Sequence, residues 1–344
     1  MTATGKKALI GVVAFVALAV AGYAALRLAW TRAAGSLTPA IGADTAPTRD
    51  GTSTKHRATP AAVEAILSSA QSYRRQGELG KANAVLAGAV REYADEQALR
   101  LEYATLLVEH RQTDAAYEQY VAALAIGPRA LEIEFAAGTV ANMAGKPDRA
   151  LEHYQAAQTA DKTNPTYALY LAQIQLKLDQ ADAAKASLLR AANLDPNLAG
   201  AWGTLAEVAL RENNISLALQ HVAKARKLEP VSLAWRLVEC RALARSGDPA
   251  KGVDLLVGLP DAQRFQSAVL QQIGECYGLL SHPADAAAVY AKASDASPAN
   301  ADLAYETARW FERAKDTPKA KKFAERAAGL GNKPAAELVT RLTK

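Results

Sequence analysis

Sequence motifs for catalysis and for metal binding are missing from this chain. None of its five histidines has another histidine, a cysteine or a pair of carboxylates at the spacing that would make a metal site on a helix. The nucleophile pattern Gly-x-Ser-x-Gly, the phosphate-binding loop Gly-x-x-x-x-Gly-Lys-Ser/Thr and the dinucleotide pattern Gly-x-Gly-x-x-Gly are absent as well. We therefore expect no metal, no cofactor and no enzyme; catalysis would need a site that these patterns do not describe.

Basic charge and aromatic residues are too few for a nucleic-acid-binding surface. Residues 1–60 hold seven of the 40 basic and two of the 35 acidic side chains, which leaves 33 of each sign in residues 61–344. Aromatic residues make up 6% of the chain. Proteins that bind nucleic acid need a sustained basic surface, and those that bind single strands add aromatic stacking platforms. We therefore expect no nucleic-acid partner.

A long apolar run occurs only near the amino terminus. After a short basic segment at residues 1–7, residues 8–26 include no charged or strongly polar side chain. Nineteen residues of helix extend about 28 Å, close to the roughly 30 Å of a bilayer core. Tyr23 and Trp30 follow near its far end, where amphipathic rings favour the membrane interface. We predict a transmembrane signal-anchor helix over residues 8–30.

The residues that flank this segment suggest its orientation. The two lysines that precede it favour a cytoplasmic amino terminus, which places the rest of the chain outside the cytoplasm, in the periplasm of a bacterium. A small-x-small sequence that ends at Ala21 also fits a signal-peptide cleavage site, and cleavage there would release a soluble exported adaptor. We favour the uncleaved anchor because apolar residues continue to Trp30. Residues 31–60, rich in Ala, Thr, Gly, Ser and Pro, are predicted to be a disordered linker.

A 34-residue pattern fills most of the remaining sequence. The prolines at position 32 of the pattern, Pro128, Pro196, Pro230 and Pro298, are separated by multiples of 34 residues. Position 20 carries alanine in seven repeats and Gly252 in the sixth. Eight repeats fit residues 63–334 without a gap: 63–96, 97–130, 131–164, 165–198, 199–232, 233–266, 267–300 and 301–334.

This pattern resembles the tetratricopeptide repeat (TPR) family, whose repeat is a helix, a tight turn and a second helix, with small residues at positions 8, 20 and 27. The resemblance implies an all-α, right-handed α-solenoid with helices near positions 2–14 and 18–31 of each repeat. Residues 335–344 are predicted to form a capping helix. Turn residues agree with this division. Gly77, Gly145 and Gly247 occupy position 15, and Pro147, Pro249 and Pro283 occupy position 17.

The sixth repeat departs from the pattern. It has Leu259 at position 27 followed by Pro260, which removes a backbone hydrogen bond and should end the second helix early. Residues 261–266 are then expected to be an irregular connection.

Cys240 and Cys276 occupy neighbouring first helices, whose usual spacing keeps cysteine Cα atoms beyond disulfide reach unless both face the contact. We interpret them as two packed thiols.

The family resemblance also implies that proteins bind in a concave groove lined by positions 2, 5, 9, 12 and 13 of the first helices. The expected function is therefore that of a membrane-tethered scaffold or assembly factor in a cell-envelope complex, holding a protein or peptide. Apolar anchors of the partner are expected in repeats two to four, and its acidic groups on the arginines of repeats five to eight. The predicted groove residues are Leu101, Phe135, Asn142, Met143, Leu169, Gln173, Arg211, Arg241, Arg245, Tyr305, Arg309 and Arg313.

Overall fold

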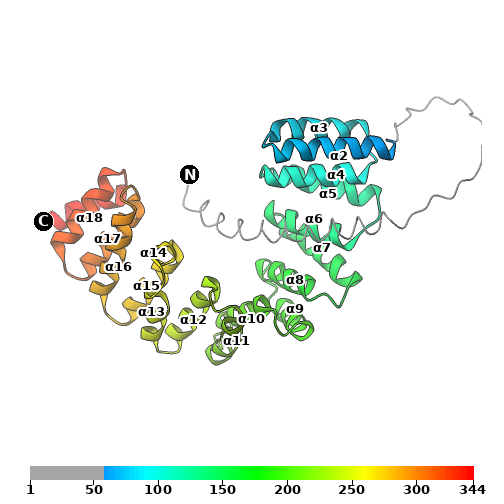
Figure 1. Cartoon of the computed structure of the whole chain (residues 1–344). Helices are drawn as coiled ribbons and strands as arrows, with labels where there is room; N and C mark the ends of the chain where they lie inside the picture. The colour runs from blue at the N-terminus through cyan, green and yellow to red at the C-terminus, as the bar shows by residue number, and fades with distance from the viewer. Residues whose placement is uncertain (1–57) are drawn as a thin grey trace, which may run out of the picture. The chain divides into compact units, whose positions relative to one another are not determined.

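The computed structural model of this protein describes residues 58–344 (Figure 1). The predicted anchor over residues 8–30 lies outside the described residues, as does almost all of the predicted linker. Within residues 58–344 the chain forms eighteen helices and no strand, which confirms the all-α prediction. None of the helices in this part of the chain combines the length and the hydropathy needed to cross a membrane.

Most helices pack as hairpins within two compact units. The first unit ends at Asp179 and the second begins at Gln180. The first contains α2 (Pro60–Arg75), α3 (Leu79–Glu92), α4 (Gln97–Glu109), α5 (Thr113–Ile126), α6 (Leu131–Met143), α7 (Pro147–Ala160) and α8 (Pro165–Lys177). The second contains α9 (Ala181–Leu194), α10 (Ala199–Arg211), α11 (Ile215–Leu228), α12 (Leu233–Arg245), α13 (Pro249–Val257), α14 (Asp261–Arg264), α15 (Ser267–Leu279), α16 (Pro283–Ala296), α17 (Ala301–Arg313), α18 (Thr317–Gly329) and α19 (Lys333–Thr343).

Every first helix of a repeat ends in the same backbone conformation. Position 15 has positive φ in all eight repeats, and the predicted glycines Gly77, Gly145 and Gly247 adopt 75°, 72° and 92°. In the other five repeats φ lies between 57° and 60° at a residue with a side chain, which costs roughly 1–2 kcal/mol. Backbone hydrogen bonds across the turn, such as the one from the Gln112 N–H to the Leu107 carbonyl at 2.9 Å, offset this cost. Those five residues are Arg111, Asp179, Asn213, Ser281 and Lys315.

Five of the eight second helices, α7, α11, α13, α16 and α18, begin with a side-chain cap or a proline just after this turn. Asn214 and Asp248, at position 16, accept backbone N–H groups of the first turn through their side chains. Proline starts α7, α13 and α16, as predicted. The typical repeat, such as α10 with α11, has helices at positions 1–13 and 17–30, so the predicted bounds are one residue late. The left-handed residue at position 15 sets this boundary.

Small residues form the seams between helices. At position 20 the alanines of seven repeats are fully buried. At position 8 of repeats three and seven, glycine makes room for an aromatic ring, because a Cβ on Gly138 or Gly274 would lie 2.8 Å from Tyr154 or Trp310. The core is thus a series of seams between neighbouring hairpins, which is why a short repeating pattern can specify it.

The sixth repeat deviates as its proline predicts, with one correction. Helix α13 has nine residues, whereas α11 has fourteen, and it ends before Pro260. The following residues are not irregular, because Asp261–Arg264 forms the one-turn helix α14. The Arg264 Nη1 group donates to the carbonyl of Val257 at 2.7 Å, so it supplies a hydrogen bond that the shortened helix lacks.

Candidate partner-binding site

Three of the four predicted apolar residues of the first unit pack against its own core. The Phe135 ring lies 5.4 Å, 5.2 Å and 4.9 Å, centroid to centroid, from Tyr154, Tyr167 and Tyr170. Leu169 is 7% exposed. Leu101 packs beside the buried cluster of α4, α5 and α6. These three side chains therefore expose less surface to a partner than apolar anchors in a groove would.

The other predicted residues of the first unit, the apolar Met143 and the amides Asn142 and Gln173, are partly exposed on its first helices. Asn142 and Met143 are the last two residues of α6 and are partly exposed. The Asn142 side-chain oxygen accepts a hydrogen bond from Lys177, the last residue of α8. Gln173, on α8, is also partly exposed. The contact between Asn142 and Lys177 shows that position 12 of one first helix meets position 13 of the next.

Three predicted arginines of the second unit line one pocket. The pocket lies between α10 and α12, has a volume of about 110 Å³, and is lined by Glu207, Leu210, Arg211, Arg241 and Arg245. Stacking places equal positions of consecutive first helices side by side, and positions 9 and 13 share a helix face because they are four residues apart. The repeat and the helical period together therefore bring the three guanidinium groups to one place.

Positively charged side chains outnumber negatively charged ones in this pocket. Arg241 Nη2 donates to Glu207 Oε1 at 3.0 Å. Arg245 Nη1 donates to the carbonyl of Leu210 at 2.7 Å, which satisfies a carbonyl in the last turn of α10. Arg211 makes no ion pair with any residue in the described range 58–344. Three cations thus face one carboxylate. An exposed pair such as Arg241 with Glu207 is worth at most about 1 kcal/mol, so an incoming carboxylate can displace Glu207.

The remaining predicted residues lie on α17 and do not line this pocket. Arg309 Nη1 pairs with Glu306 Oε1 at 3.0 Å, and its guanidinium carbon lies 5.9 Å from the centre of the Tyr305 ring. The Arg313 guanidinium carbon lies 4.6 Å from the centre of the Trp310 ring. These arginines are engaged along their own helix, so the structure separates them from the arginines of α10 and α12.

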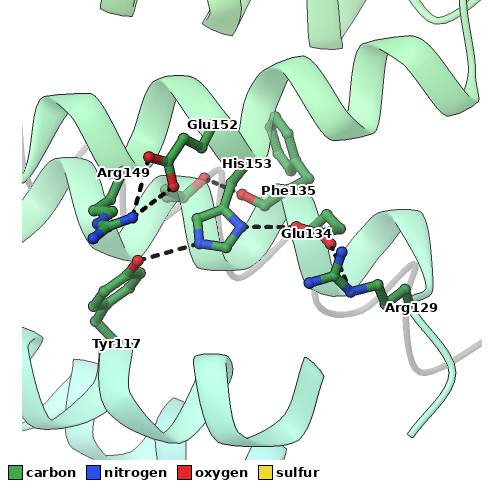
Figure 2. Close-up of polar contacts among 8 residues, drawn as sticks. Tyr117, Arg129, Glu134, Phe135, Arg149, Glu152 and His153 are labelled. Atoms are coloured by element: carbon green, nitrogen blue, oxygen red, sulfur yellow. Dashed lines mark hydrogen bonds and ion pairs between the residues drawn. The ribbon is translucent and has the colours of Figure 1, made fainter. Parts of the chain in front are cut away.

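A polar network around the buried Glu134 carboxylate, which was not predicted from the sequence, joins α5, α6 and α7 (Figure 2). Glu134 is 5% exposed and its Oε2 lies 2.7 Å from His153 Nδ1. The Tyr117 hydroxyl lies 3.3 Å from His153 Nε2, and Arg129 Nε lies 3.7 Å from Glu134 Oε1. A carboxylate only accepts, so His153 Nδ1–H donates to Glu134. At Nε2 a neutral ring accepts from the Tyr117 hydroxyl, and a protonated ring donates to it. Both ring nitrogens therefore have a hydrogen-bond partner within the hairpin region.

One signal in the sequence could have revealed this network. Glu134 occupies position 4 of its repeat, the position of Trp202 in the fifth. A charge at a position that packs against the next helix needs a buried partner, and His153 on the second helix of the same repeat supplies it. The network therefore supports the hairpin structurally.

Comparisons with known proteins bear on the fold. No protein-family model matches the sequence, and no curated protein matches it. Among solved structures, a tetratricopeptide repeat protein from Parabacteroides merdae has a TM-score of 0.54 and 18% identity, over 72% of this chain and 99% of that one. PilW, a widely conserved type IV pilus biogenesis factor, has a TM-score of 0.52 and 18% identity, over 62% of this chain and 99% of its own. The chain therefore has the fold of the tetratricopeptide repeat proteins, as its 34-residue pattern predicts.

Proposed function

We propose that this protein is a membrane-tethered scaffold or assembly factor of a cell-envelope complex. We also propose that its arginines bind acidic groups of a partner polypeptide. The observation that carries the proposal is the pocket of Arg211, Arg241 and Arg245, in which three guanidinium groups face the single carboxylate of Glu207. The fold supports protein binding as the general role. The likeness in fold to a pilus biogenesis factor is compatible with assembly work in the envelope.

The pocket suits a carboxylate side chain or a carboxyl terminus of the partner. Arg241 can turn its planar guanidinium from Glu207 to the incoming group and form two parallel hydrogen bonds, and Arg211 adds a second cation. Arg245 is held at its carbonyl contact and supplies a fixed positive charge. Because these groups are near the surface, their main effects are on the rate and orientation of encounter.

The pocket arginines should control association. The partner is first identified by affinity capture of the full-length chain from detergent-solubilised membranes. The double variant Arg241→Glu with Arg245→Glu should then bind that partner about tenfold more slowly at low salt, with most of the difference lost at high salt. The measurement is the association rate on an immobilised partner.

The matched control changes the same two repeat positions on another helix. Arg309→Glu with Arg313→Glu alters α17, outside the pocket, and should leave the association rate within about twofold of wild type. If the pocket variant binds as fast as wild type, or if both variants are equally slow, the pocket is not the contact site.

The membrane tether rests on the uncharged run of residues 8–26. Washing membranes with alkaline carbonate should leave the protein in the membrane fraction, and protease added from outside the cytoplasm should digest the repeats. The measurement is immunoblotting of each fraction. A soluble protein whose amino terminus lies near Gly22 would contradict the anchor and support the alternative function, an exported soluble adaptor.

A further inference from the structure

Two buried cysteines face each other in the second unit. Cys240 lies on α12 and Cys276 on α15, and both are fully buried. Their sulfur atoms are 3.5 Å apart and share a hydrogen bond. A disulfide between neighbouring first helices requires that both cysteines face the contact, and these two do.

The surroundings leave room for the two sulfur atoms and for little else. The pair lies in an apolar cluster with Val253, Leu256 and Ile273. A Cβ on Gly252 would lie 3.1 Å from the sulfur of Cys240 and 3.4 Å from that of Cys276. Together with the Cys240 carbonyl oxygen, 3.2 Å from that Cβ, the sulfur atoms leave an alanine little room at position 20, where the other seven repeats have one.

We propose that Cys240 and Cys276 form an intramolecular disulfide that links α12 directly to α15. A disulfide needs about 2.05 Å between the sulfur atoms, so the two side chains must approach by roughly 1.5 Å. The link would brace the repeat whose second helix α13 is shortened to nine residues. It would also close a loop between residues 36 positions apart, which restricts the unfolded chain.

The chemistry is thiol–disulfide exchange with a small-molecule or protein disulfide as oxidant. With oxidised glutathione, the Cys276 thiolate attacks one glutathione sulfur and releases one glutathione thiolate. Cys240 then loses its proton and attacks the sulfur of Cys276, which releases the second glutathione. Two protein thiols become one disulfide, and two electrons pass to glutathione. The hydrogen bond from Cys240 lowers the pKa of Cys276, while the same hydrogen bond, with burial, raises the pKa of Cys240.

Burial determines when this exchange takes place. An oxidant cannot reach two fully buried sulfur atoms in the native unit, so the first attack requires local opening or an incompletely folded chain. The disulfide should therefore form quickly during refolding and slowly in the folded protein. Once formed, it would be protected from reductants by the same burial.

The test uses the full-length chain in mild detergent, refolded from denaturant with a mixture of oxidised and reduced glutathione. After unfolding and alkylation with iodoacetamide, the protein mass should show no alkylated cysteine and a loss of two hydrogens. The melting temperature should exceed that of the reduced protein by roughly 5 °C. Cys276→Ala should show no effect of reductant on its melting temperature.

Three outcomes would overturn the proposal. They are two alkylated cysteines after oxidative refolding, mixed disulfides with glutathione only, and covalent dimers in place of the intramolecular bond. Each is read from the mass of the wild-type chain, so the test does not depend on a variant folding correctly. None of them bears on partner binding, which leaves the proposed function to be judged separately.

Discussion

Replacement of Phe135 by alanine is expected to lower the free energy of unfolding of the first unit by about 3 kcal/mol. Its ring packs on Tyr154, Tyr167 and Tyr170, with centroid distances of 4.9–5.4 Å. Tyr154 is fully buried and its hydroxyl hydrogen-bonds to Thr139, so this cluster cannot easily collapse into the space left by the ring. The cost should therefore include both lost burial and a residual cavity.

The positions of the tryptophans help to tell the two units apart. Trp202, Trp235 and Trp310 belong to the second unit, whereas the fourth, Trp30, lies outside the described residues in the predicted anchor. In a urea titration of the full-length chain in detergent, Phe135→Ala should shift the loss of helical circular dichroism toward lower urea. The change in tryptophan fluorescence should move less.

The control is Phe135→Leu, which keeps most of the volume and should cost less than about 1.5 kcal/mol. If Phe135→Ala leaves the urea profile unchanged and weakens only the binding of the captured partner, Phe135 is a contact residue, as the sequence analysis predicts. If stability falls as expected, a loss of binding in this variant says nothing about direct contact.

Replacement of His153 by alanine is expected to lower the free energy of unfolding of the first unit by about 2 kcal/mol. The change removes the 2.7 Å hydrogen bond to Glu134, whose carboxylate stays buried at 5% exposure. The remaining cation, Arg129, is 3.7 Å away and largely exposed, so it compensates poorly. Urea denaturation followed by circular dichroism measures the change.

The second unit offers a matched control for the His153 variant. His282 Nδ1 lies 3.5 Å from Asp285, but both side chains are about 60% exposed, so His282→Ala should cost less than about 0.5 kcal/mol. A double-mutant cycle of His153→Ala with Glu134→Gln isolates the energy of the pair. Equal effects of the two histidine variants, or additive effects within the cycle, would show that the Glu134–His153 contact contributes no specific stability.

The sequence alone determined the repeating part of this structure. Each repeat contacts chiefly its neighbours, so the same close helix contacts recur every 34 residues. These contacts favour small residues at positions 8, 20 and 27 of each repeat. Turn signals are local too, which is why Gly77, Gly145 and Gly247 could be assigned left-handed backbone without a structure. Pro260 likewise predicted the early end of α13 from its own chemistry.

Contacts between side chains of different helices were decided only by the tertiary structure. A repeat position says which face of a helix a residue occupies, but not how that helix is rotated against the next or where a long side chain ends. For this reason the sequence placed all the arginines in one group, whereas Arg211, Arg241 and Arg245 share a pocket and the arginines of α17 do not. The same reason hid the pairing of Glu134 with His153 and the facing sulfur atoms of Cys240 and Cys276. The division after Asp179, which falls between the two helices of the fourth repeat, is likewise not marked in a strictly periodic sequence.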